Sequence, residues 1–230
     1  MCGIVCAFDV QSNSDFVRAN FLKMAQKVRH RGPDWSGVYS NNNAVLAHER
    51  LAIVDPTSGK QPIISDDGNK VIAVNGEIYN HKDLKEKYAS DYNFKTESDC
   101  EVLLALYEKK EINFLNDLNG IFGFALYDTS NDKYIVARDH MGIIPLYMGW
   151  DKENIFYVSS ELKSLEGVCN KIELFPPGHY LDSSIGKLKK WYEPKWISYE
   201  SVKDSETKIK KIHDSLSAAV KRQLMSDVPY

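Results

Sequence analysis

The residue with the clearest chemical potential is the cysteine at the second position, in the opening Met1-Cys2-Gly3-Ile4. If processing removes Met1, Cys2 becomes the N-terminal residue and carries a thiol and a free α-amine together. An N-terminal amine can act as the base that activates such a nucleophile. The two groups titrate near ~8.5 and ~8, so a proton can pass between them at little cost. Taken alone, however, the apolar run at 4–8 is more typical of a buried strand. The opening of the chain by itself therefore favours a structural interpretation.

Further polar clusters lie beside apolar runs. Asn75-Gly76-Glu77 follows the run at 71–74, and an Asn amide next to a Gly N–H could form an oxyanion hole. The alternative for an Asn-Gly pair is a hairpin turn. Arg50, in the sequence His48-Glu49-Arg50-Leu51, could clamp a carboxylate with two hydrogen bonds, or else form a structural ion pair.

Asp99 follows Ser98 at a predicted helix start, where a carboxylate is stabilised by the helix N-terminus. Its alternative role is to pair with the ammonium group of a ligand. The basic segment 29–34 (RHRGPD) could hold a phosphate, but a helix end followed by a turn is favoured. We expect His30 and His48 to be structural, and residues 48–52 do not match the HExxH zinc motif.

Together, a thiol, a carboxylate clamp, an ammonium partner and an oxyanion-hole candidate describe one kind of site. It would bind an α-amino acid and attack its side-chain carbonyl.

The bulk properties set limits on function. The chain has 230 residues, enough for one large domain or two modest ones, and a net charge of −3. No basic field indicates a nucleic acid or an anionic membrane as partner, and no apolar stretch reaches the ~20 residues of a spanning helix. No signal peptide is recognised. The four cysteines form no CxxC pair, so we expect neither a disulfide framework nor a metal site, and a reduced, soluble, cytoplasmic protein.

The elements that must position these residues follow from apolar periodicity. Short β-branched and aromatic runs predict buried strands at 3–8, 44–47, 71–74, 121–127, 134–137 and 156–159. Val17, Phe21, Met24 and Val28 predict one helix. A second begins at Ser98, where Ser98 and Glu101 match a capping box. A third is predicted from Val202 to Leu224, with an apolar side that includes Ile209, Ile212, Leu216, Ala219 and Val220.

The periodicity lapses between Trp191 and Ser205, which predicts a domain boundary there. We expect a first domain at 1–195 and, at 196–230, a linker and the first helix of a second domain that the sequence leaves unfinished.

The clusters resemble the class II glutamine amidotransferases, the N-terminal-nucleophile type of glutaminase, and most closely the glutaminase half of glutamine-hydrolysing asparagine synthetases. The motifs stand in family order over nearly the whole chain: 2–4 (CGI), 29–34 (RHRGPD), 48–51 (HERL), 75–80 (NGEIYN), 98–101 (SDCE), 138–147 (RDHMGIIPLY), 160–165 (SELKSL) and 175–178 (FPPG). The RGPD continuation points to the asparagine synthetases. One departure is Ile144, where many members carry lysine, and we expect it to affect packing or coupling rather than hydrolysis.

The resemblance implies an α+β fold, a four-layer αββα sandwich of two antiparallel sheets (the N-terminal-nucleophile hydrolase fold). It also implies the site. Cys2 would be the nucleophile with its α-amine as base, and Asn75 and the Gly76 N–H the oxyanion hole. Arg50 would bind the α-carboxylate of glutamine, and Glu77 and Asp99 its α-ammonium. Backbone contacts along the substrate would come from Leu51, Ala52, Ile53 and Val54.

The implied reaction is hydrolysis of L-glutamine to glutamate and ammonia through a Cys2 thioester. Ammonia would pass through an internal tunnel to a C-terminal synthetase domain that uses ATP and Mg to amidate aspartate. The resemblance implies no cofactor for the glutaminase domain itself. Three points stay open: a non-catalytic amidotransferase-like module, a synthetase with another acceptor, and the oligomeric state, a homodimer being one alternative.

Overall fold

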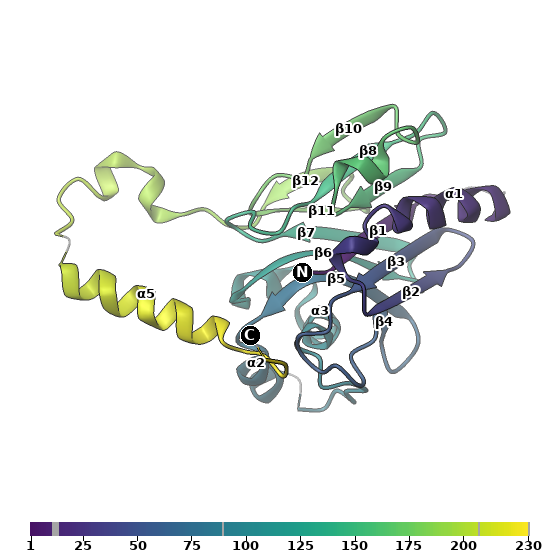
Figure 1. The fold of residues 1–230 in the computed structure, drawn as a ribbon. Coiled ribbons are helices and arrows are strands. Elements are labelled where there is room, and N and C mark those ends of the chain that lie inside the picture. Colours follow the sequence, from purple (N-terminus) through teal and green to yellow (C-terminus); the bar gives the residue numbers. More distant parts are fainter. Residues whose placement is uncertain (11–13, 89, 207, 230) are drawn as a thin grey trace.

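Two antiparallel sheets packed face to face form the body of the protein (Figure 1). The computed structural model describes residues 1–10, 14–88, 90–206 and 208–229. In spatial order, the first sheet contains β10 (Lys171–Leu174), β8 (Tyr147–Trp150), β9 (Phe156–Ser159), β1 (Gly3–Phe8), β3 (Ala44–Arg50) and β2 (Trp35–Ser40). The second contains β12 (Lys187–Lys190), β11 (His179–Asp182), β7 (Lys133–Arg138), β6 (Gly120–Asp128), β5 (Lys70–Ile78) and β4 (Ile63–Ile64).

Strand β1 is buried on both faces because it is a central strand of the first sheet and lies between the second sheet and a helix layer. Alternate residues of a strand point to opposite faces. Ile4, Cys6 and Phe8 pack in the cluster between the sheets, together with Val71 of β5 and Ala125 of β6. The residues in between, such as Val5, pack with α1 (Ser14–Gln26) and α4 (Leu162–Leu165).

The second sheet is covered in the same way on its outer face. Val74 and Phe124 pack with Leu84 of α2 (His81–Tyr88) and with Leu103 and Leu106 of α3 (Val102–Lys110). The short 3₁₀ helix η3 (Glu111–Asp117) follows α3. The layers are therefore helix, sheet, sheet, helix, which confirms the predicted αββα sandwich.

The predicted strands are confirmed. Those at 3–8 and 156–159 coincide with β1 and β9, and the others lie inside β3, β5, β6 and β7. Helix α1 matches the first predicted helix, and Phe21, Met24 and Val28 are buried. The side chain of Val17 lies outside the described part of the structure.

The second helix begins as predicted, but its cap differs. The Ser98 hydroxyl accepts a hydrogen bond from the Cys100 amide (3.2 Å) and starts the 3₁₀ turn η2 (Asp99–Glu101) ahead of α3. Glu101 does not return to Ser98. Its carboxylate is fully buried and accepts from the amides of Lys95 (2.9 Å) and Thr96 (2.8 Å), which hold the preceding loop.

The motif at 138–147 folds around a buried arginine. Arg138 donates to the carbonyls of Gly142 (2.7 Å), Ile144 (2.6 Å) and Phe175 (2.6 Å). Ile144 is fully buried, and its Cγ2 would lie 3.2 Å from a Cβ at Gly123. The side chain at position 144 thus takes part in core packing.

The third predicted helix is shorter than expected. After the 3₁₀ turns η4 (Lys195–Ile197) and η5 (Tyr199–Ser201), α5 spans Ile209–Gln223, since Lys208 has an extended backbone (φ −102°, ψ 127°). Figure 1 shows α5 lying away from the sheets, at the end of an extended connection. Its apolar side is uncovered, with residues that are 51–87% exposed: Ile209, Ile212, Leu216 and Val220.

Every helix among residues 1–10, 14–88, 90–206 and 208–229 is too short or too polar to cross a bilayer.

His48 ties the two sheets together. It is fully buried in β3, and its Nε2 lies 2.8 Å from the carbonyl oxygen of Val74 in β5. Burial lowers the pKa of the imidazole to about 4, so the ring is neutral at pH 7 and donates from Nε2. The expectation of a structural role for His48 agrees with this position.

We predict that His48 makes stability dependent on pH. Between the ordinary pKa of 6.5 and about 4, the unfolded chain binds a proton here and the native protein does not. Stability therefore falls as the pH falls through this window, by about 3 kcal/mol. His48→Gln retains an amide donor and does not titrate. The loss in free energy of unfolding between pH 7 and pH 4, measured with urea, should therefore be about 3 kcal/mol smaller in this variant than in wild type. His213→Gln, on the exposed side of α5, is the control and should keep the wild-type difference; an equal difference in both variants would contradict the assignment.

Candidate active site

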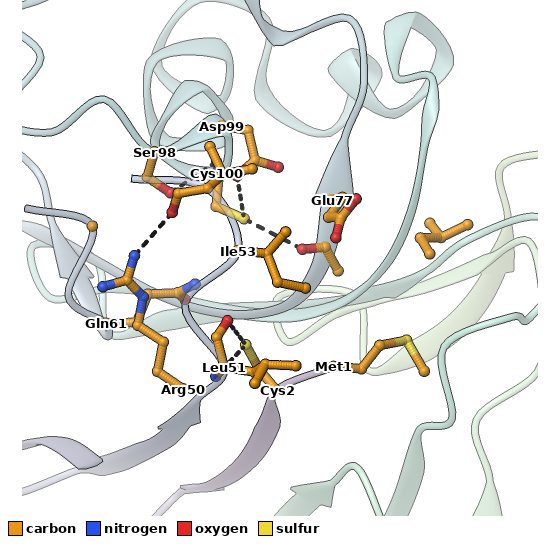
Figure 2. A pocket seen from close by; sticks show the side chains of 14 residues that line it. Met1, Cys2, Arg50, Leu51, Ile53, Gln61, Glu77, Ser98, Asp99 and Cys100 are labelled. Atoms are coloured by element: carbon orange, nitrogen blue, oxygen red, sulfur yellow. Dashed lines mark hydrogen bonds between the residues drawn. The ribbon is translucent and has the colours of Figure 1, made fainter. Parts of the chain in front are cut away.

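The Cys2 thiol is held by the backbone of Leu51, the residue that directly follows β3. The Leu51 amide donates to Cys2 Sγ (3.3 Å), and the thiol lies 3.6 Å from the Leu51 carbonyl (Figure 2). Arg31 Nε donates to the Cys2 carbonyl (2.8 Å). Burial raises the pKa of the thiol, while the Leu51 hydrogen bond, the N-terminal ammonium and Arg50 act in the opposite direction.

A pocket opens beside this thiol and collects most of the residues that the sequence singles out. Figure 2 shows Cys2 and Leu51 on one side of it, Ser98, Asp99 and Cys100 on the other, and Ile53 between them. The full lining is Met1, Cys2, Arg50, Leu51, Ile53, Val54, Gly59, Gln61, Gly76, Glu77, Ser98, Asp99, Cys100 and Ile121. Of the candidate residues, only Ala52 and Asn75 are not part of this lining.

Arg50 is the last residue of β3, and its guanidinium wraps the loop that follows. It donates to the carbonyls of Val54 (3.0 Å), Asp55 and Pro56 (3.5 Å). Gly59 leaves room for it, since a Cβ there would lie 2.6 Å from Arg50 Nη2. In the described part of the chain the guanidinium thus bonds with backbone carbonyls. Among the described residues, it does not form the structural ion pair that was the alternative from the sequence.

Two carboxyl groups face the same pocket. Asp99 accepts from the Ile78 amide (2.7 Å), and Cys100 Sγ lies 3.7 Å from Asp99 Oδ1 and 3.8 Å from the Gly76 carbonyl. Burial raises the pKa of Asp99. Burial also raises the pKa of Glu77, and the charge of Asp99 adds to this, while the N-terminal ammonium opposes it. Two desolvated acids that line one pocket favour a cation as ligand.

Asn75 and Gly76 lie inside strand β5, so the hairpin interpretation is wrong. Asn75 pairs with Gly123 and Gly76 with Phe122 along the ladder with β6, and this tertiary pairing overrides the local turn preference. Gly76 has φ +154°, and a Cβ there would lie 2.1 Å from the Ile121 carbonyl oxygen. No other residue type fits this position without moving β6.

Asn75 itself lies fully buried behind the pocket. Its Nδ2 is 3.4 Å from the Ser160 hydroxyl, and its Oδ1 is buried without a hydrogen-bond partner. The same hydroxyl accepts from the Ile4 amide (2.9 Å). Ser160 therefore connects β1, the strand that directly follows Cys2, to the asparagine of the other sheet.

The segment 29–34 is a helix end followed by a turn, as favoured from the sequence. Arg29–Arg31 forms the 3₁₀ turn η1, and Arg31 pairs with Glu161 (2.9 Å). His30 is exposed and lies 3.0 Å from the same carboxylate, away from the pocket lining. Asp34 Oδ2 accepts from the Ala52 amide (2.9 Å) and so orders the loop beside the thiol.

Sequence reasoning did not assign several residues of the site. Gln61 is buried and its Oε1 accepts from the Val74 amide (2.8 Å); no local pattern marks it. Cys100 and Ser98 could have been found, because both stand in the SDCE motif beside Asp99. Ser160 begins the SELKSL motif, which is the one signal that it offers. Within the residues that the structure describes, no group of three His, Cys, Asp or Glu could hold a metal ion.

Curated proteins align with the whole chain. It is 50% identical over 230 residues to asparagine synthetase B [glutamine-hydrolyzing] of Escherichia coli, 43% identical to asparagine synthetase [glutamine-hydrolyzing] 1 of Arabidopsis thaliana, and 44% identical to a probable asparagine synthetase of Schizosaccharomyces pombe. The alignments cover 100% of this chain but 42%, 39% and 42% of those proteins. The chain thus spans about two fifths of the length of these relatives.

Solved structures show the same fold at low identity. Glutamine phosphoribosylpyrophosphate amidotransferase from B. subtilis, complexed with ADP and GMP, has a TM-score of 0.69 at 21% identity, over 84% of this chain and 50% of that one. A second structure, an allosteric regulatory enzyme of purine biosynthesis, has a TM-score of 0.68 at 20% identity. Finally, the family model described as the glutamine amidotransferase domain matches residues 1–175, and the chain therefore belongs to the glutamine amidotransferase domain family.

Proposed function

We propose that this domain hydrolyses L-glutamine to glutamate and ammonia, with Cys2 as nucleophile after removal of Met1. The observation that carries the proposal is one pocket that joins the Cys2 thiol to Arg50, Glu77 and Asp99. A thiol at one side and groups of both charges nearby suit an α-amino acid that presents its side-chain amide to sulfur. The curated relatives are named as glutamine-hydrolysing enzymes.

The charges support one orientation of the substrate. The α-ammonium of glutamine would lie at Glu77 and Asp99, where burial raises the pKa of both carboxyl groups and a cation would stabilise their ionised forms. The α-carboxylate would lie at Arg50, whose guanidinium has five N–H donors and can add a ligand to the carbonyls that it holds. Leu51, Ala52, Ile53 and Val54 would offer backbone contacts along the substrate.

The reaction follows from the chemistry of an N-terminal cysteine. With Met1 removed, the α-amine of Cys2 accepts the thiol proton, and sulfur attacks the side-chain carbonyl carbon of glutamine. The C–N bond breaks as the amine returns a proton to the leaving nitrogen, which departs as ammonia. A γ-glutamyl thioester remains. Water then cleaves the C–S bond, giving glutamate and the free thiol.

Asn75 and the Gly76 N–H would stabilise the oxyanion of each tetrahedral intermediate. A half-turn of the Asn75 amide would let the Ser160 hydroxyl donate to its oxygen, which otherwise lacks a partner. The NH₂ group would then be free to donate to the substrate. Ser160 would thus fix both the Cys2 strand and the direction of the amide.

For the whole protein we propose a glutamine-hydrolysing asparagine synthetase, on the names of relatives that share the full chain. Ammonia would pass to a C-terminal synthetase domain, which would use ATP and Mg to amidate aspartate. Residues 196–230 would be the linker and first helix of that domain, and the exposed apolar side of α5 supports this. A different acceptor is the alternative, and the acceptor-binding half of the protein decides it.

We predict that an electrophilic glutamine analogue forms one covalent adduct, on Cys2, and only in protein that has lost Met1. Intact mass followed by peptide mapping measures both events. Cys2→Ala should show no adduct and no glutamine hydrolysis with an unchanged fold, because the nucleophile is removed. Cys169→Ala is the matched control and should keep full labelling.

Undiminished hydrolysis by Cys2→Ala would contradict the mechanism. Processed protein that forms no adduct would favour the alternative of a non-catalytic module.

We predict that Arg50→Ala lowers kcat/KM for glutamine by about 10- to 100-fold, chiefly through KM, because a charge-assisted clamp is lost. Steady-state glutaminase kinetics measure this. Arg29→Ala removes an exposed arginine of η1 and should leave both constants unchanged. An unaltered KM in Arg50→Ala would remove Arg50 from the substrate site.

We predict that Asn75→Ala lowers kcat by about 100- to 1000-fold, as expected for loss of one oxyanion donor. Ser160→Ala should lower kcat about 10-fold with KM little changed, if its main effect is to orient the Asn75 amide rather than to hold Ile4. In the Asn75→Ala background the Ser160→Ala change should then have little further effect. Additive losses in the double variant would show that Ser160 acts independently of the amide.

A further inference from the structure

The loop 51–54 sets the geometry of the pocket, but it belongs to no strand or helix. Leu51 contacts the Cys2 thiol through both its amide and its carbonyl, and the side chains of Leu51, Ile53 and Val54 line the pocket. Without a ladder of backbone partners, such a loop depends on the individual contacts that hold it.

Two of these contacts come from the amidotransferase body. Asp34 accepts from the Ala52 amide at the start of the loop, and the Arg50 guanidinium holds the carbonyls of Val54 and Asp55 at its end. Both anchors lie in residues matched by the family model at 1–175.

The third anchor comes from the other end of the chain. The Asp227 amide donates to the Ile53 carbonyl (3.0 Å), and Asp227 Oδ2 accepts from the Asp55 amide (2.8 Å). One residue thus bonds on both sides of Val54, although 172 positions separate Asp227 from Asp55.

The turn that presents Asp227 is itself ordered. Ser226 Oγ donates to the Val228 carbonyl (2.7 Å) and accepts from the Val228 amide (3.2 Å). In Figure 1 the chain after α5 returns to the body, whereas the connection before α5 lies away from it. The contact at 226–228 therefore joins the C-terminal unit, residues 196–230, to the loop 51–54.

We propose that Asp227 is a positioning residue for glutamine binding, so that the C-terminal unit completes a site built mainly by the amidotransferase domain. The inference rests on the proposed glutaminase function. Without the Asp227 carboxylate, the Asp55 amide loses its partner and the wall formed by Ile53 and Val54 loosens. Substrate binding then weakens more than the reactivity of the thiol, because Cys2 keeps its contacts to Leu51 and Arg31.

The contact also gives the two units a direct means of communication. A ligand that shifts the position of residue 227 in the C-terminal unit alters glutamine affinity, and glutamine must alter the affinity for that ligand by the same factor.

The test compares Asp227→Ala with Asp227→Asn, which keeps a side-chain oxygen to accept from Asp55. Asp204→Ala, an exposed aspartate of the connection before α5, is the control. In the processed protein, Asp227→Ala should raise KM for glutamine about 10-fold, with kcat and the rate of Cys2 alkylation by iodoacetamide within about 2-fold of wild type. Asp227→Asn and Asp204→Ala should stay within about 2-fold in KM. A KM for Asp227→Ala within 2-fold of wild type overturns the inference.

Amide hydrogen exchange separates this inference from the proposed function. If wild-type protein hydrolyses no glutamine, the proposed function fails, and exchange at the Asp55 amide still reports the contact. That amide should be protected in wild type and in Asp227→Asn, and should exchange faster in Asp227→Ala. Equal exchange in all three proteins overturns the assignment of Asp227 as an anchor of the loop.

Discussion

The site depends on the rigid placement of a chain terminus. Chain ends usually fray unless they are tied into a sheet, and here β1 lies between β3 and β9 with both faces buried. Immediately before it, Arg31 holds the Cys2 carbonyl and Leu51 holds the thiol. A flexible residue 2 would lose the effective concentration that positioned nucleophiles provide. In the proposed mechanism, the buried strand β1 supplies the orientation of Cys2, which is the residue directly before it.

A second constraint is electrostatic. Glu77 and Asp99 are desolvated in one pocket: burial raises the pKa of both carboxyl groups, and the charge of Asp99 raises that of Glu77 further. In a folded protein such unfavourable placement persists where a ligand or a reaction uses it. In the described part of the chain Arg50 forms no ion pair with either carboxylate, since its guanidinium bonds with carbonyls of the following loop. The pocket is therefore prepared for an added cation, and an α-ammonium has the charge and donors to fill that role.

Much of the fold could be predicted because its core strands are short, β-branched and buried on both faces, as in β1 and β9. The Asn-Gly pair shows the limit of local reasoning: its turn preference yields to the long pairing of β5 with β6. Glu101 likewise satisfies a loop rather than its own helix cap. Gln61, Ser160 and Asp227 could not be assigned, since their partners lie 13, 85 and 172 positions away and no periodicity relates them.

The loop 51–54 has to satisfy two opposed requirements. It must be firm enough to hold the thiol and the wall of the pocket, yet a site that binds and releases ligands draws on regions of low local stability. Both requirements are met when a few separate side chains anchor the loop, rather than a continuous ladder of backbone hydrogen bonds. Asp34 and Arg50 come from the body of the domain, whereas Asp227 follows a helix whose apolar side is uncovered. A partner that covered that side of α5 would therefore also limit the movement of residue 227 and, through it, of the loop that carries Ile53 and Val54.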